Sequence, residues 1–190
     1  MKFLARPLKR FSREEDGLVM TEFLIMLPLL VWTFMALFIY WDAFRTINQS
    51  QKAAYAVSDL VSRQSEVDRP FIGGMEKVME YLTNGKSVRM RITSIQWDAI
   101  AEEYHVIFSE SPGGEMPKLT ASDVADMADD KIPIMASGDT VVIVETEVAY
   151  TPAFDVGITA HTFDNFIVTR PRYYVKVCLI EDPLSCASAI

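Results

Sequence analysis

Cysteine and histidine are scarce in this sequence, and basic residues are outnumbered by acidic ones. With 2 Cys and 2 His in 190 residues, the chain cannot build a Cys/His zinc framework or a dense disulfide scaffold. The 18 Lys and Arg against 26 Asp and Glu give a formal net charge of −8. Such a chain lacks the basic surface that a general nucleic-acid-binding protein needs, and we expect no nucleic-acid partner.

Sequence motifs with a defined catalytic chemistry are also missing. Neither H-E-x-x-H nor G-x-S-x-G occurs. Gly85-Lys86-Ser87 matches the end of a P-loop, but Glu80 stands where that motif needs its first glycine. His105, on a predicted strand, and His161, in a predicted loop, have no partner motif. The sequence predicts no enzyme, no catalytic residue, no metal site and no cofactor.

Two groups of acidic residues require an interpretation. Glu145 and Glu147 share one face of a predicted strand, which we interpret as the solvated face of a half-buried sheet. A short predicted helix over residues 122–130 carries four carboxylates: Asp123, Asp126, Asp129 and Asp130. Calcium needs oxygen ligands that converge from a bent loop, whereas a helix spreads its side chains around itself. We therefore interpret this second group as a solvated acidic helix face.

One long apolar run stands near the N-terminus. Phe23–Trp41 has 19 residues and no charge. As a helix it is about 29 Å long, close to the ~30 Å hydrocarbon core of a bilayer. Thirteen residues between 18 and 41 are Leu, Ile, Val or Phe, and together they contribute about −4 to −8 kcal/mol toward insertion. The sequence predicts a transmembrane helix over residues 18–41.

The flanks of this run predict its orientation. Residues 1–17 form a leader with five basic and three acidic residues, a net charge of +2. The positive-inside rule places this leader in the cytoplasm and residues 42–190 outside. A cleaved secretory signal peptide is the competing interpretation, but its apolar core would be about 7–15 residues long and small residues would follow it. Tyr40-Trp41-Asp42 follows here, which favours a retained single-pass helix.

Glu22 is the one charged residue inside the start of the apolar segment. Inserting an ionised carboxylate costs a few kcal/mol at the bilayer centre and less near its edge. Two interpretations follow from membrane physics: an interfacial acid that reaches water, or a functional charge that awaits a partner. Pro28, further along, lacks an N–H and is predicted to bend the helix, either as a proline that membranes tolerate or as a functional kink.

The local string Gly17-Leu18-Val19-Met20-Thr21-Glu22-Phe23 resembles the processing site of type IV prepilins: a glycine, four residues, then Glu and an aromatic residue. In that family an aspartic prepilin peptidase cuts after the glycine on the cytoplasmic side. The resemblance implies cleavage between Gly17 and Leu18. Glu22 would then lie one helical turn from the new Leu18 ammonium and could pair with that of a neighbouring subunit, which would set the register of staggered helices.

A longer match narrows the family. Glu22-Phe23-Leu24-Ile25-Met26-Leu27-Pro28 resembles the E-F-x-x-x-x-P start of TadE-like proteins, minor pseudopilins of the tight-adherence (Tad/Flp) pilus system. Phe23 after the glutamate, where the small major pilin has Tyr, points to a TadE/TadF-like protein. Looser similarity extends over residues 53–63 and over Thr169-Arg170-Pro171-Arg172. The resemblance covers residues 17–63 most specifically.

This resemblance implies a structural or assembly role in the inner membrane, with the C-terminal domain periplasmic or extracytoplasmic. The implied partners are the prepilin peptidase, the major Flp-type pilin, other minor pseudopilins, the inner-membrane pilus platform and membrane lipid. The sequence leaves open a TadE or a TadF role and a place in the fibre or at its base. The alternative is an uncleaved single-span protein that anchors an extracytoplasmic binding or sensor domain.

The remainder of the chain predicts an α+β domain. Residues 42–66 continue the helix, with apolar residues at helical spacing: Phe44, Ile47, Ala54, Val57, Leu60 and Val61. Residues 67–190 form the outer domain, with a break at Arg69-Pro70 and Gly73-Gly74 and a short helix over residues 75–82. Four strands are predicted around residues 88–93, 104–109, 141–150 and 166–179. We expect a small antiparallel sheet on the long helix, a pilin-like arrangement.

Cys178 and Cys186 enclose a turn at Asp182-Pro183. In a domain outside the cytoplasm a disulfide is favoured over two free thiols, and closing so small a loop stabilises the fold by about 2–3 kcal/mol in the chain-entropy model.

We predict that a thiol reagent labels neither cysteine in unreduced, denatured protein and labels both after reduction. The measurement is the mass of the labelled chain. Full labelling before reduction contradicts an exported domain.

Overall fold

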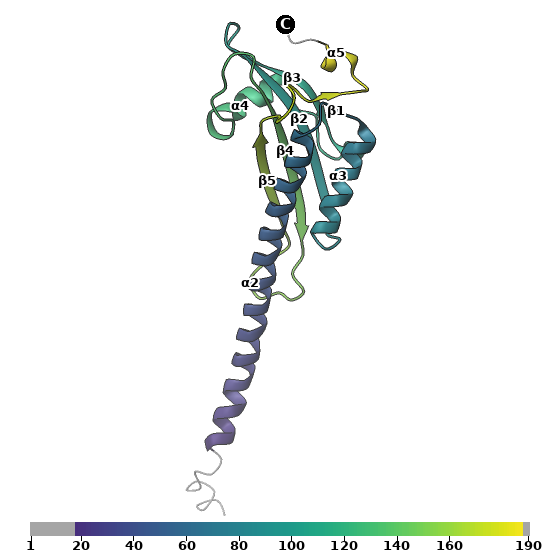
Figure 1. Cartoon of the computed structure of the whole chain (residues 1–190). Coiled ribbons are helices and arrows are strands. Elements are labelled where there is room, and N and C mark those ends of the chain that lie inside the picture. Colours follow the sequence, from purple (N-terminus) through teal and green to yellow (C-terminus); the bar gives the residue numbers. More distant parts are fainter. Residues whose placement is uncertain (1–17, 188–190) are drawn as a thin grey trace, which may run out of the picture. The chain divides into compact units, whose positions relative to one another are not determined.

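The structure is a computed structural model that describes residues 18–187, without the side chains of Leu18 and Asp129. The leader and Gly17 lie outside the described residues. The α+β prediction is confirmed: a long apolar N-terminal helix is followed by a small antiparallel sheet (Figure 1). The helices are α2 (Leu18–Ser62), α3 (Arg69–Leu82), α4 (Ala121–Lys131) and α5 (Pro183–Cys186), with a 3₁₀ turn η1 (Pro112–Gly114). The strands are β1 (Glu66–Val67), β2 (Val88–Asp98), β3 (Glu103–Glu110), β4 (Thr140–Tyr150), β5 (His161–Thr169) and β6 (Cys178–Leu179).

The described chain divides into two compact units. The first holds α2 as far as Asp42 together with the loop Pro152–Thr159. The second holds Ala43–Thr151 and the chain from Ala160 onward. Helix α2 runs without interruption through the boundary, so one helix belongs to both units.

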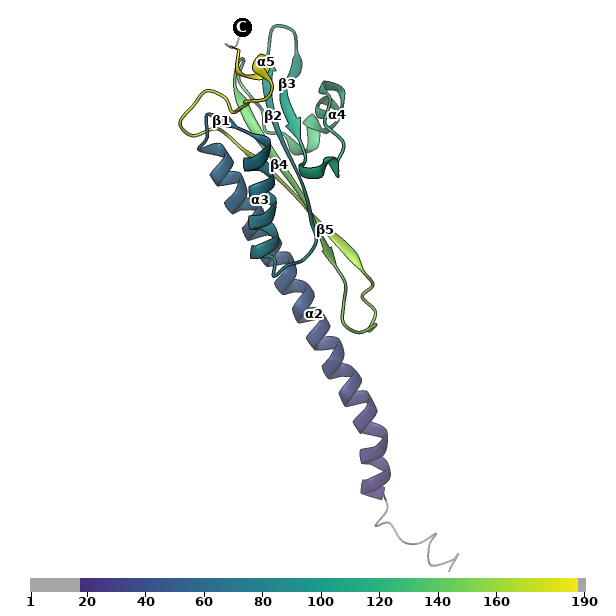
Figure 2. The same ribbon diagram turned by 90° about the vertical axis from the view of Figure 1, so that its right-hand side faces the viewer.

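The second unit is built on a four-stranded antiparallel sheet in the order β3-β2-β4-β5. The hairpin predicted around Asp98–Glu103 joins β2 to β3. A register shift at Ser94/Ile95 marks a bulge in this pair. Strands β2 and β4 form the centre of the sheet, and their apolar side chains fill cores on both of its faces. Figure 2 shows α2 and α3 on one side of the sheet and α4 on the other.

The first core lies between the sheet and the second half of α2. The buried residues in this half of α2 lie on one helix face and are mostly small: Ala43, Thr46, Ser50, Ala53, Ala54, Val57, Ser58, Val61 and Ser62. Of these residues, Ala53, Ala54, Val57 and Val61 pack in one core with apolar residues of the strands. Two residues of the predicted apolar face are outside the core, since Phe44 is 64% and Leu60 41% exposed.

The second core lies on the opposite face of the sheet, under α4. Val124 of α4 packs with Val141 and Ile143 of β4. The helix starts at a capping box, in which the Thr120 side chain accepts from the Asp123 N–H and the Asp123 carboxylate accepts from the Thr120 N–H. One of the four clustered aspartates is thus a helix cap, and it stays on the exposed surface.

This second face also carries an ion pair that the sequence did not predict to be shielded. Arg91 donates from Nε to Glu145 Oε2 at 2.7 Å and from Nη1 to the carbonyl of Pro117. Its Nη2 atom forms an ion pair with Glu145 Oε2 at 2.6 Å. The two side chains are only 9% and 14% exposed. The interpretation of Glu145 as part of a solvated face is wrong, because α4 and the segment before it cover this part of the sheet. One step along the strands, Arg89 and Glu147 make a second pair that is 50% and 27% exposed.

Helix α3 begins earlier than predicted. Asp68 is its N-cap and accepts from the Phe71 N–H at 2.7 Å. Pro70 stands in the first turn, where a missing N–H removes no helical hydrogen bond. The helix then continues through Gly73-Gly74, so the predicted break at these residues is wrong.

The strand predicted around residues 166–179 is two separate strands in the structure, β5 and β6. Strand β5 covers His161–Thr169, so His161 lies on a strand and not in a loop. Arg170-Pro171 ends β5, since proline cannot donate to a ladder. The two-residue strand β6 pairs in parallel with β1. Helix α2 ends at Ser62, before the predicted end of the helix 42–66, and Glu66 belongs to β1. Cys178 of β6 and Cys186 of α5 are joined in a disulfide.

The two arginine pairs yield a matched prediction. Arg91→Met leaves Glu145 as a shielded, unpaired charge, and we expect it to lower the free energy of unfolding by about 3–5 kcal/mol. Arg89→Met on the same strand should cost less than about 1 kcal/mol, because its pair is half exposed. Denaturant unfolding of the full chain in detergent measures both values. Equal losses contradict the shielding of Arg91.

Candidate functional site

The first half of α2 has no protein cover. Every described side chain from Val19 to Phe34 is exposed, on all sides of the helix. Large apolar side chains dominate this stretch, among them Leu24, Ile25 and Phe34. Among the described residues, α2 from Val19 onward is the one helix long and apolar enough to cross a membrane. A surface of this kind is stable only in apolar surroundings, such as lipid or other helices.

Glu22 lies in the second turn of this uncovered helix. Phe23 beside it is exposed, as are the apolar residues of the following turns. The next basic residue along the chain is Arg45, 23 positions later and about 34 Å away along the helix. Within α2, the Glu22 carboxylate therefore has no cation near it.

Leu18 is the first described residue, and α2 begins there. The predicted cleavage position lies between Leu18, which is in α2, and Gly17, which is outside the described residues. Leu18 and Glu22 are four residues apart on one helix, about 6 Å along its axis. An amine at Leu18 and the Glu22 carboxylate would project from adjacent turns.

Pro28 is incorporated within α2, which continues on both sides of it. Its ring nitrogen cannot donate to the carbonyl of Leu24, so one backbone acceptor of the uncovered segment lacks its usual partner. Thr33 donates its hydroxyl to the Leu29 carbonyl at 2.8 Å, so this polar group has a hydrogen-bond partner within its own helix. Both features are compatible with a helix in lipid.

The uncovered segment ends over two helical turns. Met35 and Ala36 are half-buried and Ile39 is buried, whereas Tyr40 and Trp41 are exposed. Exposed Tyr and Trp at the end of an apolar run are typical of the membrane–water interface. The loop Pro152–Thr159 belongs to this unit. Sequence reasoning missed it, although the apolar Phe154, Val156 and Ile158 in a hairpin loop were a usable signal.

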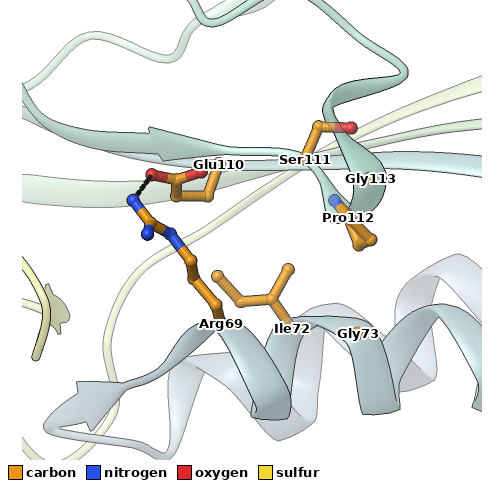
Figure 3. Close-up of a pocket in the computed structure, with 7 residues that line it drawn as sticks. All are labelled: Arg69, Ile72, Gly73, Glu110, Ser111, Pro112 and Gly113. Atoms are coloured by element: carbon orange, nitrogen blue, oxygen red, sulfur yellow. Dashed lines mark hydrogen bonds and ion pairs between the residues drawn. The ribbon is translucent and has the colours of Figure 1, made fainter.

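The outer domain has a pocket of about 180 Å³ between the start of α3 and the turn after β3 (Figure 3). Lys118 Nζ and Arg69 Nη2 both donate to Glu110 Oε1, at 2.6 and 3.2 Å. Burial opposes ionisation of Glu110, but these hydrogen bonds outweigh it and lower the pKa of the carboxyl below its usual value. Ser111 accepts from the Met116 N–H. The polar side chains of this pocket are thus bonded within the protein, and we assign them a structural role.

One group of potential metal ligands occurs among the described residues. The side-chain donor atoms of Glu66, Cys178 and Cys186 lie within 4.8 Å of one another. The two sulfurs are bonded to each other, so neither is a thiolate that could bind a metal ion. The pair ties β6 to α5 beside the β1–β6 ladder, a structural role.

The comparisons with known proteins find no matching family model, no similar curated protein and no similar solved structure.

Proposed function

We propose that this protein is a TadE-like minor pseudopilin of a Tad/Flp pilus system, a structural or assembly component and not an enzyme. The observation that carries the proposal is Glu22, a carboxylate in the apolar first half of α2. No other part of the described chain covers this half from Val19 to Phe34. Its spacing from Gly17 and Leu18 matches the prepilin processing pattern. The α+β outer domain on a long N-terminal helix is consistent with the pilin-like arrangement that the sequence predicts.

Processing creates the charge that Glu22 lacks. A prepilin peptidase hydrolyses the peptide bond between Gly17 and Leu18, and one water adds across it. The leader leaves with a C-terminal carboxylate, and Leu18 becomes an N-terminal ammonium. Since this ammonium starts the helix, no charged side chain has to be carried into the apolar segment to provide a cation.

Electrostatics then favours association of α2 with a neighbouring helix. Opposite charges 4 Å apart attract by about 4 kcal/mol at an effective dielectric constant of 20. This is comparable to the cost of about 2.5–3.5 kcal/mol for holding a charged side chain in the membrane. Because Leu18 precedes Glu22 by four residues, a neighbour that brings its ammonium to Glu22 must be displaced by about 6 Å along the helix axis. The pair thus selects one staggered register.

This function assigns an inner-membrane location with the leader in the cytoplasm and the outer domain outside. The exposed apolar surface of α2 contacts lipid before assembly and other pseudopilins, the major pilin or the inner-membrane platform afterwards. The alternative, an uncleaved anchor for an outer binding or sensor domain, uses the same helix but provides no partner for Glu22.

N-terminal sequencing of the protein purified from membranes distinguishes these functions. We predict that the mature chain begins at Leu18. A Gly17→Phe variant is the matched control and should retain Met1, since the family pattern requires glycine before the cleaved bond. Wild-type protein that retains Met1 while pili assemble normally rules out the processing mechanism.

Replacing Glu22 tests the charge pair. We predict that Glu22→Gln reduces co-purification with its pseudopilin partners at least about tenfold, as expected for loss of a desolvated ion pair worth 1.4 kcal/mol or more. The amount of the variant in the membrane fraction should not fall, because a neutral side chain inserts more easily.

Glu22→Asp, which keeps the charge on a shorter side chain, is the control and should retain more association than Glu22→Gln. Unchanged association of Glu22→Gln would show that Glu22 does not form the proposed pair, even if the helix remains in the membrane.

A further inference from the structure

We propose that the loop Pro152–Thr159 is a second membrane-contact element, which places Phe154 among the lipid headgroups beside the end of the transmembrane segment. The inference rests on the membrane location of α2 in the proposed function. It adds a lipid-binding surface that comes from the sheet and not from the N-terminal helix.

The composition of this loop is unusual for a connection between two antiparallel strands. Loops of this kind are normally rich in polar turn residues and face water. Here the sequence is Pro-Ala-Phe-Asp-Val-Gly-Ile-Thr, with a single charge at Asp155. Phe154 is 49% exposed, whereas Val156 is buried. The loop is held in place by one apolar residue and presents another outward.

The grouping of the loop with α2 suggests what the exposed Phe154 contacts. The loop connects β4 to β5, yet it groups with residues of α2 up to Asp42 and not with the sheet. Protein cover on α2 begins at Met35, and the first buried residue of the helix is Ile39, which is 1% exposed. Ile39 precedes Asp42, the first charge after the apolar run, by three residues or about 4–5 Å. The loop therefore groups with the part of the chain that holds the apolar segment of α2 and the end of that segment at Asp42.

Backbone chemistry restricts the depth of the loop to the interface. A loop cannot enter the hydrocarbon region, because its N–H and C=O groups would lose water without gaining partners. Asp155 accepts from the Gly157 N–H at 3.4 Å and is exposed, which also requires a polar environment. Phe154 can insert from this level, as aromatic residues of interfacial anchors do. Tyr40 and Trp41 of the same unit are exposed near the same boundary.

Lipid is the occupant that these observations favour. Phe154 is exposed in the same unit as the uncovered apolar surface of α2, and lipid is what covers that surface in the proposed function. A neighbouring protein chain would also cover Phe154, and the experiment below separates the two.

Site-specific fluorescence on the reconstituted full chain tests the inference. The chain has no free cysteine, so one added cysteine can be labelled with the environment-sensitive dye NBD without reducing the disulfide. Ala153→Cys places the dye beside an intact Phe154 on an exposed position. Leu30→Cys reports the apolar segment. Tyr173→Cys, 69% exposed in the second unit, reports the outer domain.

The vesicles contain lipids with a spin-label quencher either near the headgroup or near the end of the acyl chain. We expect blue-shifted emission at position 153, with a greater loss of emission from the shallow quencher than from the deep one. Position 30 should show the opposite order, and position 173 should lose no emission to either. In the Ala153→Cys background, Phe154→Ser should reduce the quenching, whereas Ile134→Ser, a 99% exposed control in the second unit, should not.

Each other outcome overturns the inference in a distinguishable way. Quenching at position 30 but not at 153 leaves the transmembrane segment intact and refutes the loop contact. A blue shift at position 153 without lipid quenching shows that a protein neighbour covers Phe154. Absence of quenching at position 30 refutes the membrane location itself, and the loop contact with it.

Discussion

The structure depends on one constraint: the first half of α2 exposes apolar side chains in every direction. A helix of this kind cannot remain in water, so the N-terminal segment requires lipid or other helices around it. This segment has few polar groups, and each of them differs from its apolar surroundings. Thr33 bonds its own helix, Pro28 removes a donor, and Glu22 has no cation within its own helix before Arg45. The proposed function provides a cation for this carboxylate.

The second half of α2, in contrast, has a face that the protein itself buries. Its buried face is made mostly of small residues such as Ser50, Ala53 and Ala54. The sheet in turn shields the Arg91–Glu145 pair on its other face. One continuous helix therefore joins an apolar segment to a packed α+β domain, and the loop Pro152–Thr159 returns from that domain to the unit that contains the apolar segment.

Sequence alone determined the features that depend on local chemistry. Length and apolarity predicted the uncovered segment of α2, and Glu22 stood out as its only charge. Alternating residues and a turn predicted the β2–β3 hairpin. Apolar residues at helical spacing predicted that the helix continues over residues 42–66, since a period of about 3.6 is visible without any partner, and α2 ends at Ser62.

Only the tertiary structure decided which residues face which neighbour. Phe44 and Leu60 have the right spacing for a core face but are exposed, because the sheet packs on small residues instead. Glu145 has the alternation of a solvated residue but is shielded, because α4 covers it from a distant part of the sequence. Phe154 lies in the loop between β4 and β5, and this loop groups with α2 up to Asp42 and not with the sheet. Burial is a property of contacts between segments far apart in the chain, and a local pattern does not contain them.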